Sequence, residues 1–173
     1  MTHAFRNQTN HLQPTTLTQG RNTMTQRQAK ILSDGDVRRL LDAVKHHRYA
    51  LRDRVMILLS VKAGLRAGEI ANLTWPMVMT ATGRISPLIE LHNDAAKNGS
   101  GRMIPMHPVL WAALECWRES YAELLADQEN DWQGSVIVSE RGDAGWQGMR
   151  ASSVVTWFAS LYHRQGLLGC CRD

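Results

Sequence analysis

The 173-residue sequence has no long apolar run and little cysteine. No segment approaches the roughly 20 apolar residues that span a bilayer, and Thr, Asn and Gln occupy the N-terminal positions where a signal peptide would be apolar. We therefore expect a protein without a membrane partner, located in the cytoplasm. The cysteines, Cys116, Cys170 and Cys171, are odd in number and form no complete disulfide framework, so reduced thiols are expected.

The apolar content of 43% is sufficient for one hydrophobic core. Residues 1–30 are dominated by Thr, Gln and Asn without apolar periodicity, which predicts a disordered polar tail. Residues 31–173 are predicted to form a single domain. The adjacent His46 and His47 lack further residues at metal-ligand spacing, so no metal site is expected.

The net charge of +4 is unevenly distributed along the chain. Residues 21–54 carry nine Lys and Arg against four Asp, whereas residues 115–143 carry eight acidic residues against two Arg. One interpretation is a basic face that meets a polyanion such as nucleic acid. The alternative is a solvated helical surface with no specific partner, and the charge pattern alone does not separate the two.

Apolar periodicity predicts a mainly helical fold. Ser33 and Asp36 have the spacing of a capping box in front of a helix, and the nearly continuous apolar segment 51–61 indicates a central buried helix. Gly64 is expected to end that helix. The other helices are predicted to begin near Ala67, at Pro108, and at Ser152 or Ser153, with inward residues Ile70 and Leu73, then Leu110, Leu114, Trp117, Tyr121 and Leu124, then Val154, Trp157, Phe158 and Leu161.

Two predicted strands, 85–91 and 102–106, flank a loop that contains Asn98-Gly99, which favours a β-hairpin. Because Pro87 and Pro105 restrict these strands to edges or bulges, the sheet is expected to be small. A further short strand is predicted at 135–138, followed by a Gly-rich loop. The expected fold class is mainly α (α+β), with a small antiparallel hairpin.

The segment "AGLRAGEIANLTW" and the later "AKNGSGRMIPMHPVL" resemble the catalytic domain of the tyrosine recombinases, the phage-integrase family, over roughly residues 31–169. The resemblance implies site-specific DNA recombination and integration, by strand cleavage and rejoining without a metal or nucleotide cofactor. It also implies double-stranded DNA and other recombinase subunits as partners.

Three residues match the catalytic positions of that family. Arg66, in the Gly-Leu-Arg turn, would contact the scissile phosphate, because a planar guanidinium matches two phosphate oxygens. Glu69 would support the Arg66 guanidinium, and Lys97 would protonate the leaving 5′ oxygen. In isolation, Arg66 and Glu69 also fit an ordinary surface ion pair, and Lys97 fits an ordinary hairpin loop.

The family pattern is incomplete downstream of the hairpin. No His-x-x-Arg motif follows it, and Tyr49, Tyr121 and Tyr162 fit packing positions better than that of a nucleophile. We therefore expect a C-terminally truncated catalytic domain that is inactive alone. The alternative is a DNA-binding or regulatory remnant that competes with a full-length integrase, and a third reading is a generic helical domain.

Overall fold

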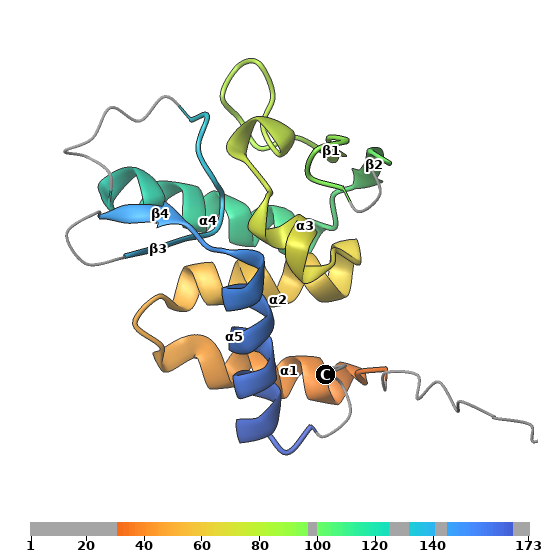
Figure 1. Ribbon diagram of the computed structural model, residues 1–173, viewed down its shortest axis with the longest axis vertical. Helices are drawn as coiled ribbons and strands as arrows, with labels where there is room; N and C mark the ends of the chain where they lie inside the picture. The colour runs from red at the N-terminus through yellow and green to blue at the C-terminus, as the bar shows by residue number, and fades with distance from the viewer. Residues whose placement is uncertain (1–30, 97–99, 125–131, 141–144, 168–173) are drawn as a thin grey trace, which may run out of the picture.

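The computed structural model describes residues 31–96, 100–124, 132–140 and 145–167 (Figure 1). Along the described residues, three α-helices come first, followed by a strand pair, a helix, a second strand pair and a last helix, which confirms the predicted mainly α fold class. The helices are α1 (Asp34–Ala43), α2 (Ala50–Ala63), α3 (Ala67–Ala71), α4 (Pro108–Leu124) and α5 (Ala151–Arg164), and the strands are β1 (Leu88–Leu91), β2 (Arg102–Pro105), β3 (Val138–Glu140) and β4 (Trp146–Gly148). The predicted tail, residues 1–30, lies outside the described residues.

Helix α1 begins as its sequence predicts. The Ser33 hydroxyl accepts a hydrogen bond from the Asp36 backbone N–H at 3.2 Å, and the Asp36 carboxylate accepts one from the Ser33 backbone N–H at 3.1 Å. This reciprocal capping box satisfies two N–H groups that a helix start otherwise leaves without partners.

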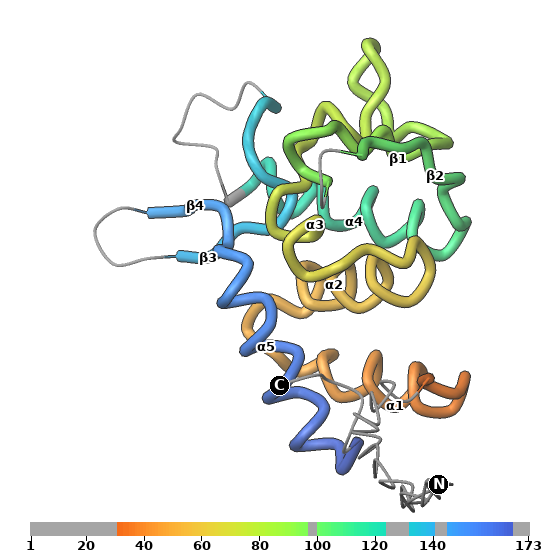
Figure 2. The backbone as a smooth tube through the Cα atoms, turned by 45° about the vertical axis from the view of Figure 1, so that its right-hand side comes forward, coloured from red at the N-terminus to blue at the C-terminus, as the bar shows by residue number. Residues whose placement is uncertain are grey.

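Helix α2 is the central helix of the core. Five consecutive residues from Val55 to Leu59 are at most 1% exposed, and the helix packs mainly against α4 on one side and α1 on another. In both views α2 lies between α1 and the β1–β2 pair (Figures 1 and 2). It ends at Gly64, whose φ of +66° is the left-handed conformation that glycine adopts at helix C-termini.

The strands form two separate antiparallel pairs. In the first, Leu88 lies opposite Pro105 and Leu91 opposite Arg102, so the predicted hairpin is present. Its first strand is shorter than predicted, because Ile85 pairs with Met79 in an isolated bridge before Pro87 interrupts the ladder. The second pair is formed by β3 and β4. The strand predicted at 135–138 overlaps β3 only at Val138, and β4 lies where a Gly-rich loop was predicted.

Helices α4 and α5 complete the core. Leu110, Leu114, Trp117 and Tyr121 are all at most 4% exposed, as the periodicity predicts. The predicted start of α5 at Ser152 or Ser153 is wrong. The N-cap is Arg150, because the preceding Met149 is already bound to the Ile137 carbonyl and ends the extended segment there. No helix in the described part of the chain is long and apolar enough to cross a membrane.

Candidate functional site

The turn between α2 and α3 presents Arg66 to solvent. Leu65 is buried, and its backbone N–H donates to the Leu59 carbonyl at 3.1 Å, so the residue before Arg66 is anchored in the core. Arg66 follows in an extended conformation at the N-cap of α3. Its side chain is 64% exposed, so a buried scaffold carries an exposed guanidinium.

Glu69 lies beneath this turn. Its side chain is only 2% exposed, and its Oε2 accepts a hydrogen bond from the Arg66 backbone N–H at 2.9 Å. The Arg66 guanidinium approaches Glu69 less closely, with 3.5 Å between Nη1 and Oε1. The carboxylate therefore fixes the Arg66 backbone more firmly than the Arg66 side chain.

The main partner of Glu69 is Arg102 of β2. The Arg102 Nη1 donates to Oε1 at 2.9 Å and its Nη2 donates to Oε2 at 3.1 Å, which is a bidentate ion pair. The sequence predicts a strand at 102–106 but does not predict this pairing. Arg102 is itself held in place, because Gly101 donates to Asn93 Oδ1 at 2.8 Å and a Cβ on Gly101 would lie 2.6 Å from the Leu91 carbonyl oxygen.

The two arginines determine the charge state of Glu69. Hydrogen bonds from Arg102 lower the Glu69 pKa from 4.5 to about 2, with help from the Arg66 backbone N–H and against the cost of burial. The carboxylate in turn raises the Arg102 pKa. The three groups therefore carry a net charge of +1 at neutral pH, and both guanidinium groups reach the surface.

This arrangement predicts a loss of stability in acid. The folded-state pKa of Glu69 lies below its unfolded-state value, so its contribution is complete above about pH 4.5 and is lost as the pH falls to about 2. The shift corresponds to at most about 3 kcal/mol. Urea unfolding across this pH range should show a smaller decrease for Glu69→Gln than for the wild type, and identical pH profiles would contradict the prediction.

Lys97 lies outside the described residues, so its role in protonating the leaving 5′ oxygen stays a prediction. The residues before it, Ala95 and Ala96, are buried, and both donate their backbone N–H groups to the His92 carbonyl. The structure thus brings Arg66, Glu69 and Arg102 together and describes the hairpin up to the position before Lys97.

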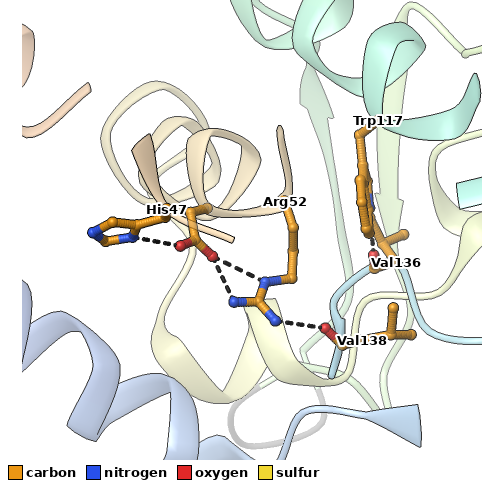
Figure 3. Close-up of polar contacts among 6 residues, drawn as sticks. His47, Arg52, Trp117, Val136 and Val138 are labelled. Carbon is orange, nitrogen blue, oxygen red and sulfur yellow. Dashed lines mark hydrogen bonds and ion pairs between the residues drawn. The ribbon is translucent and has the colours of Figure 1, made fainter. Parts of the chain in front are cut away.

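A second ionic cluster lies inside the molecule and was not predicted. Arg52 donates twice to Asp53 Oδ1, at 2.9 and 2.7 Å, and once to the Val138 carbonyl at 3.0 Å (Figure 3). His47 Nδ1 lies 2.7 Å from the other Asp53 oxygen. Arg52 and Asp53 are both buried, and an adjacent Arg-Asp pair inside an apolar helix was the available signal.

The second cluster connects β3 to the start of α2. Its two permanently charged residues, Arg52 and Asp53, are both buried, so we assign the cluster a structural role. The described residues contain no group of three or more side chains that could hold a metal ion.

Comparison with known proteins agrees with this architecture. Residues 30–167 match the model of the phage integrase family. The fold is similar to that of the XerA recombinase, with a TM-score of 0.56 and 20% identity, over 81% of this chain and 44% of the XerA chain. No curated protein matches the sequence. The family match covers most of the chain, and the protein therefore belongs to the phage integrase family, whose fold of a tyrosine recombinase catalytic domain it shares.

Proposed function

We propose that this chain binds double-stranded DNA through the Arg66 turn, as part of a domain for site-specific recombination. The observation that supports the proposal is an exposed guanidinium on a turn anchored by the buried Leu65, beside a carboxylate already neutralised by Arg102. The domain comprises residues 31–173, with residues 1–30 as a separate tail.

Arg66 is suited to a phosphodiester. Cleavage of a phosphodiester builds negative charge on the non-bridging oxygens, and a guanidinium fixed in advance stabilises that charge without further reorganisation. Within the described residues, the Arg66 guanidinium has a single ion-pair contact with Glu69, at 3.5 Å from Nη1, so its other N–H donors are available for phosphate oxygens. In this proposal Lys97 supplies the proton to the leaving 5′ oxygen.

We further propose that residues 1–173, taken by themselves, bind DNA without cleaving it. Tyr121 and Tyr162 are buried. The Tyr49 hydroxyl donates to Glu140 at 3.0 Å, and burial raises the pKa of Tyr49, which disfavours the phenolate. A nicked suicide substrate tests this directly: we expect no covalent protein–DNA adduct, and a phosphotyrosine on any of the three residues would refute it.

The DNA contact itself is tested with Arg66→Ala. A charge-assisted hydrogen bond contributes about 1.5–3 kcal/mol, so affinity for a labelled duplex should fall about 10- to 100-fold. The slope of log K against log salt should decrease by about one. Fluorescence anisotropy at several salt concentrations measures both quantities.

The matched control is Arg39→Ala. Arg39 is also exposed and paired with an acid three residues away, Asp36, at 2.8 Å. It belongs to α1, on the far side of α2 from the β1–β2 pair (Figure 2). If Arg39→Ala and Arg66→Ala weaken binding equally, the effect is one of net charge and the proposal is wrong.

A further inference from the structure

We propose that Arg102 is a positioning residue that prevents Glu69 from capturing the Arg66 side chain. This inference rests on the proposed DNA contact of Arg66 and adds a second arginine to that site. In it, the strand β2 determines whether the guanidinium of the α2–α3 turn remains available to a phosphate.

The geometry shows two arginines beside one oxygen. Arg102 Nη1 lies 2.9 Å from Glu69 Oε1 and Arg66 Nη1 lies 3.5 Å from the same atom. Arg102 also has a second hydrogen bond to Oε2, whereas the Arg66 side chain has a single, longer contact. Arg102 therefore forms the close hydrogen bonds to both carboxylate oxygens, and the Arg66 side chain remains at a longer distance from one of them.

Burial makes Arg102 necessary for this arrangement. A carboxylate that is 2% exposed requires a charged or hydrogen-bonding partner, because its charge is poorly hydrated. Within the described residues, Arg66 is the other cation that forms an ion pair with Glu69. If Arg102 is removed, the favoured response is for Arg66 to turn inward and donate to Glu69.

An inward turn of the Arg66 side chain would neutralise its charge at the proposed DNA contact. With Arg102 present, the three groups carry a net charge of +1; without it, Arg66 and Glu69 would form a neutral pair. An Arg66 side chain bonded to a carboxylate must break that bond before it binds a phosphate, and the phosphate then lies beside an unneutralised carboxylate. Both effects oppose DNA binding.

The bond also joins two parts of the chain. Glu69 on α3 and Arg102 on β2 are 33 residues apart in sequence. The same carboxylate holds the Arg66 backbone N–H. The hairpin and the Arg66 turn are thus fixed to one common group.

A mutant cycle tests the inference. Arg66→Ala is introduced into three backgrounds: wild type, Arg102→Met, and Arg102→Met with Glu69→Gln. DNA affinity and its salt slope are measured for each by anisotropy, and thermal unfolding verifies that each protein is folded. Arg102→Met should reduce affinity about as much as Arg66→Ala does, about tenfold or more.

The decisive quantity is the effect of Arg66→Ala in each background. In the Arg102→Met background it should change affinity less than about twofold, because Arg66 is already bound to Glu69. Adding Glu69→Gln removes the competing charge, so the Arg66 effect should return to about its wild-type size. Loss of structure alone would not restore a specific dependence on Arg66.

Three outcomes would overturn the inference. Equal effects of Arg66→Ala in the wild-type and Arg102→Met backgrounds would show that Arg102 does not control Arg66. No Arg66 effect in the Arg102→Met, Glu69→Gln background would also refute it.

If Arg102→Met does not fold, Arg102→Lys replaces it, because lysine keeps a positive charge beside the Glu69 carboxylate. Arg66→Ala should then retain most of its effect on DNA affinity, and loss of that effect in the Arg102→Lys background would refute the inference. An absent Arg66 effect in the wild type instead refutes the proposed DNA contact.

Discussion

Asp53→Ala should lower the free energy of unfolding by about 3–5 kcal/mol. The Asp53 side chain is 3% exposed and the Arg52 side chain is 8% exposed. Removal of the carboxylate leaves a buried guanidinium whose remaining hydrogen bond is to the Val138 carbonyl. Since ordinary domains have a total stability of about 5–15 kcal/mol, this loss is a large fraction. Urea unfolding followed by circular dichroism measures it.

Two further variants show whether the uncompensated charge is the cause. Asp42→Ala removes an exposed partner of Lys45 and should cost at most about 1 kcal/mol. The double variant Arg52→Met, Asp53→Leu removes both buried charges and should recover much of the loss, although the Val138 carbonyl then lacks its donor. A double variant as unstable as Asp53→Ala would contradict this account.

Trp117→Ala should be comparably damaging. Trp117 is 1% exposed on the inner face of α4, and its Nε1 donates to the Val136 carbonyl at 2.8 Å (Figure 3). Truncating a buried Trp to Ala costs about 3–5 kcal/mol through the cavity it leaves. The unsatisfied carbonyl adds about 1–3 kcal/mol. Denaturant unfolding should therefore show a protein close to the limit of folding.

Trp75 provides a matched control for the hydrogen bond. Trp75 is fully buried as well, but its Nε1 has no hydrogen-bond partner in the described part of the chain. Trp75→Phe and Trp117→Phe remove similar volume, and only the second removes a hydrogen bond. Trp117→Phe should lower the free energy of unfolding by about 1–3 kcal/mol more than Trp75→Phe does. Equal losses of stability in the two variants would show that the hydrogen bond to Val136 makes no net contribution.

Local patterns were sufficient for most of the helices. The Ser33 and Asp36 spacing, the apolar segment around Ile57 and the glycine at position 64 each act within one or two turns of chain. Helix α2 begins at Ala50, one residue before the predicted apolar segment, and the buried face of α4 follows the expected periodicity. The predicted serine start of α5 failed because a long-range backbone bond of Met149 outweighed the capping preference of serine.

Strand β4 could not be predicted for a related reason. Gly148 looks like a loop residue in the sequence, yet a Cβ there would clash with Ser135 Oγ, so the glycine allows β4 to pack closely against the segment before β3. Trp146 packs edge-to-face on Tyr49, with ring centroids 5.1 Å apart. Both contacts join segments that are separated in the sequence, so a pattern of neighbouring residues cannot predict them.

In the candidate site, too, the local contact could be predicted from the sequence and the long-range contact could not. The Arg66 and Glu69 spacing is visible in the sequence, because the two residues are neighbours on one helical turn. The bond of Glu69 to Arg102 spans 33 residues, so the sequence alone assigns Glu69 to Arg66. The strongest partner of the carboxylate emerges only when β2 is placed beside α3.

The Arg52–Val138 bond has a consequence for synthesis on the ribosome. The two residues are 86 positions apart. At roughly 5–20 residues per second, Arg52 is made about 4–17 seconds before its carbonyl acceptor. During that interval the nascent chain holds a charged helix with an incomplete shell of acceptors. Final burial of α2 is thus a late event in translation, and slower elongation between these two codons would prolong exposure of the apolar face to chaperones.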